Sequence, residues 1–231
     1  MMEQYLNLVQ RPSRYIGGET NMARKDPASA SVRFAFVFPD VYEVGMSYTG
    51  LQIIYELLNS RADTYCERVF TPWPDMADLL RKEDVPLPSL ETETPLCDFD
   101  IVGITLPHEL CYANVVETLR LGKVPVLASE RTGEAPIVIG GGSAAFNPEP
   151  IAEIFDAILL GDGEMALEKI IETYKKHGNN KSELLQALSR IQGVYIPSFF
   201  EPVYENGKFA GHRPLKPDYG KVTKNWLPDM D

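Results

Sequence analysis

The hydrophobic positions of the chain fall into short apolar runs that alternate with longer segments in which apolar residues recur every three or four positions. Such runs are typical of buried strands, and the 3.6-residue period is typical of helices that cover a sheet. The predicted strands are residues 34–38, 64–70, 100–106, 136–139 and 157–160. The predicted helices are residues 46–60, 73–82 and 109–121, with a further one that places Leu167, Ile170, Ile171 and Tyr174 inward.

Strands and helices that alternate at this spacing imply parallel neighbours joined by right-handed crossovers. The predicted fold class is therefore α/β, with a doubly wound, mostly parallel five-stranded sheet of the flavodoxin-like or Rossmann-like kind. The strand at 64–70 carries polar residues, so we expect it at an edge of the sheet.

The two ends of the chain follow other patterns. Residues 1–31 mix prolines and glycines with isolated apolar residues and predict an extended N-terminal arm, while 84–98 predicts a loop with at most a short strand. Beyond the α/β domain of residues 32–180, residues 182–191 predict a short helix. Residues 199–210 predict a hairpin that turns at Asn206-Gly207. We expect residues 181–231 to form this helix, the hairpin and a linker.

Composition limits the classes of function. At 231 residues and 44% hydrophobic, the chain supports one principal core. The formal charge of −11, from 22 basic and 33 acidic side chains, disfavours direct binding to a nucleic-acid backbone. The first thirty residues contain no apolar stretch, so we expect a cytosolic protein without a membrane span. Cys66, Cys97 and Cys111 are widely spaced and are expected to be reduced packing residues.

Four loops follow predicted strands and therefore meet at the carboxyl edge of the sheet. Glycine lets a backbone approach a ligand closely, and open α/β sheets bind ligands at this edge. Tight turns in a compact domain would explain any one loop, but the concurrence of several favours a ligand site. The candidate site residues are Asp40, Val41, Tyr42, Glu43, Val44, Gly45, Thr105, Leu106, Pro107, Gly140, Gly141, Gly142, Ala144, Gly161, Asp162, Gly163 and Glu164.

Other motifs of these loops are less specific. Residues 140–145 and 161–166 loosely match a dinucleotide fingerprint, but the first precedes Asn147-Pro148 and no helix. The second would place Asp162 and Glu164 against a pyrophosphate. His108 also follows a strand and is a candidate acid, base or ligand, although a structural role is equally expected. The sequence contains no P-loop, serine elbow or cysteine cluster, so no catalytic residue is assigned.

The stretch from Asp40 to Gly45 resembles the Asp-x-His-x-x-Gly signature of cobalamin-binding domains, with Tyr42 in the place of the histidine. Thr105-Leu106 lies where those domains carry a Ser-x-Leu element, and Gly140-Gly141 matches their later Gly-Gly. The chain from residue 11 to 164 is similar to the N-terminal part of an uncharacterised family of radical S-adenosylmethionine (SAM) proteins. There, a cobalamin-binding-like domain precedes a barrel with a Cys-x-x-x-Cys-x-x-Cys motif.

That resemblance implies cobalamin as the cofactor, with S-adenosylmethionine and a 4Fe–4S cluster only in the full-length protein. The cysteine motif is absent here, and residues 226–229 stand about where a linker to the barrel would run. We therefore expect a partner barrel in cis or as a separate chain. A phenol with an ordinary pKa of about 10 is a poor cobalt ligand, so Tyr42 predicts binding without a histidine lower ligand.

Three functions follow as alternatives. The first is a domain that holds cobalamin at the carboxyl edge for a radical SAM enzyme, without being catalytic alone. The second is a cofactor-free relative of that domain that serves in docking or substrate recognition. The third is a flavin or nucleotide binder, because the same sheet topology serves either ligand.

Overall fold

The computed structural model of the chain describes residues 2–226, and its centre is a six-stranded sheet with the order β2-β1-β3-β4-β5-β6. The first five strands are parallel, and β6 pairs with β5 in the antiparallel direction. The strands are β1 (Val32–Phe38), β2 (Thr64–Phe70), β3 (Ile101–Thr105), β4 (Ile137–Gly141), β5 (Ala157–Leu159) and β6 (Val194–Tyr195). The prediction of a mostly parallel, flavodoxin-like sheet is confirmed, with β2 at its edge.

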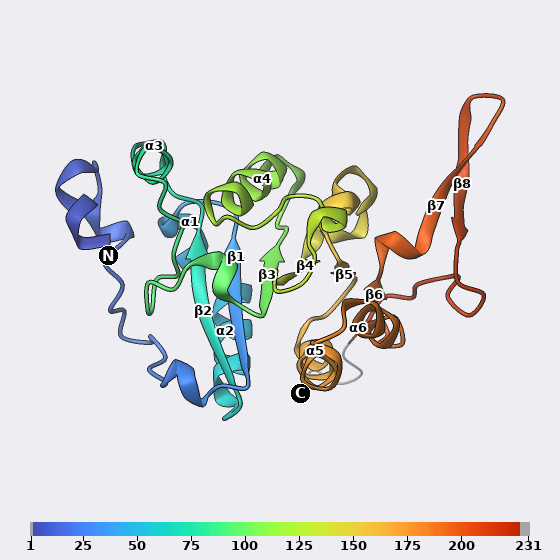
Figure 1. Ribbon diagram of the computed structural model, residues 1–231, viewed down its shortest axis with the longest axis horizontal. Coiled ribbons are helices and arrows are strands. Elements are labelled where there is room, and N and C mark those ends of the chain that lie inside the picture. The colour runs from blue at the N-terminus through green and yellow to red at the C-terminus, as the bar shows by residue number, and fades with distance from the viewer. Residues whose placement is uncertain (1, 227–231) are drawn as a thin grey trace.

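Helices cover both faces of this sheet (Figure 1). The face that carries α3 and α4 contains one apolar cluster, and the face that carries α2, α5 and α6 contains a second. The helices are α1 (Tyr42–Met46), α2 (Thr49–Ser60), α3 (Pro74–Lys82), α4 (Tyr112–Leu121), α5 (Glu164–His177) and α6 (Lys181–Leu188). On α5, three of the four residues predicted to face inward, Leu167, Ile170 and Ile171, are buried, as the helical period requires.

Four details of the prediction were wrong. The sheet has a sixth strand, β6. It was not predicted because its two residues are too few to form a recognisable apolar run. Residues 42–46 form the short helix α1, where a loop was expected, and α2 begins at Thr49. The arm is not simply extended, since it contains 3₁₀ turns at Met2–Leu8, Pro12–Arg14 and Pro27–Ser29. The helix predicted at 109–121 begins with the 3₁₀ turn Glu109–Cys111.

The edge strand β2 is buried along its whole length, although it includes Glu67 and Arg68. The segment 84–98 covers it: the amide of Leu90 donates to the carbonyl of Arg68 at 2.8 Å, and the amide of Arg68 donates to Glu91 at 2.6 Å. Covering an edge in this way prevents it from pairing with another chain. The loop predicted at 84–98 therefore protects the edge of the sheet.

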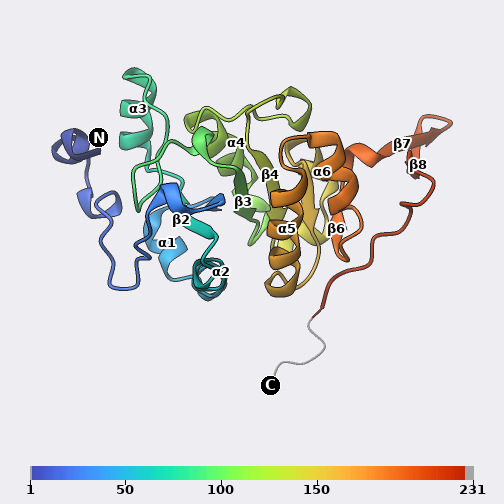
Figure 2. The same ribbon diagram turned by 60° about the horizontal axis from the view of Figure 1, so that its bottom comes forward.

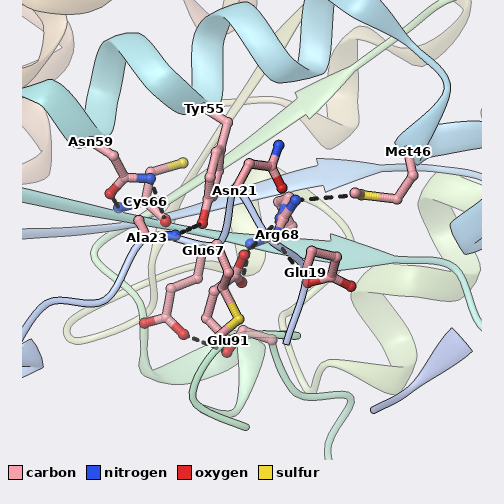
Figure 3. Close-up of polar contacts among 12 residues, drawn as sticks. Glu19, Asn21, Ala23, Met46, Tyr55, Asn59, Cys66, Glu67, Arg68 and Glu91 are labelled. Carbon is pink, nitrogen blue, oxygen red and sulfur yellow. Dashed lines mark hydrogen bonds and ion pairs between the residues drawn. The ribbon is translucent and has the colours of Figure 1, made fainter. Parts of the chain in front are cut away.

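The edge strand β2 carries one basic residue, Arg68, and its side chain is fully buried (Figure 3). Its Nε donates to Glu91 at 2.7 Å, its Nη2 lies 3.2 Å from Glu19 of the arm, and it stacks over the ring of Tyr55 at 4.4 Å. Both side chains of the Arg68–Glu91 pair are fully buried. This pair joins the arm, the edge strand and the covering segment.

The predicted hairpin is confirmed as β7 (Phe200–Glu205) and β8 (Lys208–Pro214), which project away from the sheet (Figure 2). After the hairpin, the chain returns to the body. The hydroxyl of Tyr219 donates to the carbonyl of Val194 at 2.6 Å, and Asn225 forms a bridge with Gly161 at the end of β5. The remainder of the predicted linker, residues 227–231, lies outside the described residues.

Candidate functional site

A groove of about 250 Å³ lies at the carboxyl edge of the sheet, on the face covered by α2 and α5. In this sheet order, the chain runs outward from β1 to β2 and in the other direction from β3 to β5. The strand order therefore reverses between β1 and β3, and such a switch point is where open α/β sheets bind ligands. The groove lies at that point.

Two glycines on neighbouring strands shape the floor of the groove. A Cβ at Gly103 would lie 2.3 Å from the ring of Phe34, so the absence of a side chain there lets this ring pack against β3. A Cβ at Gly141 would meet nothing nearer than 3.8 Å, so the groove is open above this residue. Along β4, Ile139 and Gly141 face the same side. The floor is thus apolar and partly aromatic, with its free space at Gly141.

The walls are the beginnings of α2 and α5. Ile54 of α2 lies 3.4 Å from the position of a Cβ at Gly163, so the glycine allows the two helices to approach. Glu164, the first residue of α5, lines the groove, and its Oε2 is buried without a hydrogen-bond partner among residues 2–226. No lysine, arginine or histidine of the described chain lines the groove. Its polar side chains are therefore the two acids Asp162 and Glu164 and the hydroxyl groups of Tyr48 and Thr105.

Two turns at the rim require glycine. Gly142 has φ of 102°, and Gly161 has φ of 100°. A Cβ at Gly161 would lie 1.9 Å from the carbonyl oxygen of Asn225, which accepts from the amide of Asp162 at 3.2 Å. The returning C-terminal segment therefore closes one side of the rim and fits only beside a glycine.

The structure brings together eight of the predicted site residues. Those that line the groove are Thr105, Gly140, Gly141, Gly142, Gly161, Asp162, Gly163 and Glu164. Gly140 contributes backbone alone, since a Cβ there would meet Phe155 at 3.0 Å on the opposite face. Leu106 and Ala144 are buried in that opposite face and hold the turn, because the amide of Leu106 donates to Gly141 at 2.6 Å and that of Ala144 to Leu106 at 2.9 Å. Pro107 and His108 do not line the groove.

The loop with the cobalamin-like signature, residues 40–45, faces the N-terminal arm and does not line the groove. The Tyr42 hydroxyl donates to Glu19 at 3.0 Å, and its ring packs against Phe70. The side chain of Asp40 accepts from the amide of Val41 at 2.7 Å, next to the start of α1. Val44 is exposed, and Gly45 is buried where a Cβ would meet the Phe70 ring at 2.3 Å. Tyr42 is therefore used to attach the arm.

Glu43 fastens the same loop to the arm through Arg11 and Arg14, each 2.9 Å away. Partial desolvation raises the pKa of Glu43, but its backbone hydrogen bond and the two arginines outweigh this effect and lower the pKa from 4.5 to about 2. A lowered pKa in the folded state stabilises the protein above the ordinary pKa, and this contribution is lost as the pH falls through the folded value.

We therefore expect Glu43→Gln to lower the free energy of unfolding near pH 7, by less than about 1 kcal/mol because the side chain is well exposed. The difference between wild type and variant should shrink below pH 4.5 and vanish only below pH 2. Denaturant titrations at a series of pH values measure it, with Glu168→Gln, an exposed site, as the control. A difference that does not change with pH would contradict the assignment.

Several groove residues were missed by the sequence analysis. They are Phe34, Phe36, Tyr48, Gly50, Ile53, Ile54, Gly103, Ile104, Ile139, Leu159 and Leu167. A glycine inside a strand marks a close approach, so Gly103 was detectable within the predicted strand 100–106. The alternation of β1 also places Phe34 and Phe36 on one face. The Ile54 contribution depends on how two helices meet, which no local pattern shows.

Each connection at the carboxyl edge also exposes a large apolar side chain. Val44, Trp73, Leu110, Phe146 and Met165 follow β1 to β5 in turn, and Leu110 is 89% exposed. Single exposed apolar side chains are common, but their recurrence on all five connections of one edge makes this edge a candidate contact surface. Within residues 2–226 there is no group of three potential metal-ligating side chains, and no helix is long and apolar enough to cross a membrane.

The sheet order and the groove at the switch point define a flavodoxin-like α/β domain. Residues 50–197 match the sequence family described as the N-terminal region of radical SAM proteins. Because this match covers more than half of the chain, the protein belongs to that family. No curated protein matches the chain in sequence.

Proposed function

We propose that the domain binds cobalamin at the carboxyl edge for an associated radical SAM enzyme, with the nucleotide tail of the cofactor in the groove between α2 and α5. The observation that supports this most is the opening above Gly141, where the missing side chain leaves free space in a groove that Phe34 also lines. Pockets for whole drug-sized ligands have volumes of about 300–1,000 Å³. A groove of about 250 Å³ suits the base and ribose, with the corrin outside on the edge.

The residues that would hold the tail come from both sides of the groove. Gly141 and Phe34 would contact the base, Ile54 and Leu167 would supply apolar walls, and Glu164 would offer an acceptor to a donor of the tail. Cobalamin, when bound, supplies the cobalt chemistry, while these residues bind and orient it. Because Tyr42 is hydrogen-bonded to the arm, this chain brings no side chain from the signature position to the lower face of the cobalt.

The alternative of a flavin or multiply phosphorylated nucleotide fits the groove less well. Phosphates in flavodoxin-like folds are stabilised by helix N-termini and by cations. Here α5 begins at Glu164, and Asp162 lies two residues before it. No basic side chain of the described residues lines the groove. Two carboxylates at this point repel a phosphate placed against the N-terminus of α5, whereas the single phosphodiester of a cobalamin tail would lie outside the groove with the corrin.

The second candidate function is docking without a cofactor, and the apolar series on the edge favours it. Its five members lie on all five parallel-strand connections, which is a wider area than the tail of a cofactor would cover. The occupant would be the catalytic barrel of the radical SAM enzyme, since the family consists of N-terminal regions of such proteins.

Anaerobic titration of the purified chain with hydroxocobalamin and methylcobalamin, followed by visible spectroscopy, tests the proposal. We expect saturable binding with a spectral shift to the form in which the lower base has left the cobalt, because the groove takes that base. A folded chain that leaves the spectrum unchanged, and that binds a separately expressed radical SAM barrel, would contradict the cofactor assignment and support docking.

A further inference from the structure

Glu164 carries a buried carboxylate oxygen beside the groove, and an apolar base in the groove would leave this oxygen without a hydrogen-bond donor. Its Oε2 has no hydrogen-bond partner among the described residues, although the side chain lines a slot that is otherwise mostly apolar. An ionised carboxylate only accepts hydrogen bonds, and leaving a buried acceptor unsatisfied is costly. A ligand whose N–H donor draws this carboxylate toward the slot therefore gains more than a ligand without such a donor.

The lower base of a cobalamin-type cofactor differs in this respect between two natural chemical classes. Dimethylbenzimidazole, once it has left the cobalt and remains attached to its ribose, has a lone pair on its free ring nitrogen and no N–H. Adenine carries an exocyclic amino group with two N–H donors. The first base would present an acceptor or methyl groups to the carboxylate of Glu164, and the second can donate to it.

We propose that Glu164 is a specificity-determining residue that makes the groove select a cobamide whose lower base is an amino-bearing purine. This inference rests on the proposed function and concerns the same groove. The adenine ring lies against the Phe34 floor above Gly141, and its amino group donates to Glu164 Oε2. Hydrogen bonds to charged acceptors are about twice as strong as neutral ones, so this contact can dominate the choice between bases of similar size.

The other polar groups of the groove support this assignment. Tyr48 and Thr105 can donate or accept, and no basic residue of the described chain lines the slot, so Glu164 is the charged acceptor that a base in the groove can meet. An amide in place of the carboxylate adds a hydrogen-bond donor at this position. Glutamine can therefore donate to the ring nitrogen of dimethylbenzimidazole, which the carboxylate cannot do. The substitution Glu164→Gln therefore changes the preference without changing the size of the side chain.

The test compares the dissociation constants of adeninylcobamide and of cobalamin for the purified chain, measured by calorimetry or visible spectroscopy. In wild type, we expect adeninylcobamide to bind at least about tenfold more tightly. In Glu164→Gln, this ratio should fall to about one or below. Glu168→Gln, which removes the same charge from an exposed position one turn later on α5, should keep the wild-type ratio.

Equal affinities in wild type, or a ratio that Glu164→Gln does not change, would overturn the selection of the base while leaving cobamide binding intact. The second result is what hydrogen bonding of Glu164 to a ribose hydroxyl would give, since both cofactors carry the ribose. If neither cobamide binds to a chain that circular dichroism shows to be folded, the proposed function itself fails, and this inference fails with it. The outcomes therefore separate the two proposals.

Discussion

Replacement of Gly141 by leucine is expected to weaken cobalamin binding by at least about a hundredfold while the domain stays folded. The new Cβ would meet nothing closer than 3.8 Å, so the strand accommodates it, and the rest of the side chain extends into the groove. One methylene too many in an apolar pocket already changes affinity by about 10–200-fold. A four-carbon side chain in a groove of about 250 Å³ removes the space that the base needs.

The matched control is Gly220→Leu, which makes the same substitution where a Cβ would have no neighbour within 4 Å. This variant should bind the cofactor as wild type does. Thermal unfolding of both variants shows whether the fold is kept. If Gly141→Leu binds cobalamin as tightly as wild type, the groove is not the binding site, even if the wild-type titration is positive.

The second large effect concerns stability. We expect Arg68→Met to lower the free energy of unfolding by about 3–5 kcal/mol, because removing one partner of a buried ion pair leaves the other charge unpaired. Glu91 would lose both its 2.7 Å contact and its neutralising charge in a fully buried position. For a chain of this length, such a loss corresponds to a fall in Tm of roughly 6–20 °C. The arm should also become more sensitive to protease, since Glu19 loses its partner.

Two further variants show whether the loss of stability comes from the unpaired buried charge. Arg68→Met combined with Glu91→Gln removes both charges and should recover at least half of the lost stability, because neither partner is left charged and buried. Arg81→Met breaks exposed ion pairs on α3 and should cost less than about 1 kcal/mol. An Arg68→Met variant within 1 kcal/mol of wild type would show that the buried pair does not hold this edge together.

The parts of the site that the sequence predicted are those set by the chain's own local pattern. Strands that end in glycine place Gly141 and Gly161 at one edge, whatever else the fold does, because parallel strands share a carboxyl edge. The first loop shows the limit of such reasoning. Its signature placed Tyr42 at the site by analogy, but residues 42–46 form a helix that directs the hydroxyl to Glu19 of the arm.

The remaining misses are tertiary. The strand β6 consists of two residues and exists because it pairs with β5. The groove wall depends on the meeting of Ile54 with Gly163, which lie more than a hundred residues apart in the chain. The polar residues of β2 correctly predicted an edge strand, but the segment 84–98 that covers Glu67 and Arg68 there could not be predicted from the local pattern. In each case the deciding partner is distant in sequence.

The contacts of the arm have a consequence for synthesis of the protein. The amide of Met2 donates to Glu93, 91 residues later, and Glu19 pairs with Arg68, which itself depends on Glu91. At about 5–20 residues per second, the arm waits on the order of 5–20 s for these partners to be made. The arm is thus synthesised before the segment that holds it, and it can take its final place on the sheet edge only after residues 91–93 have been made.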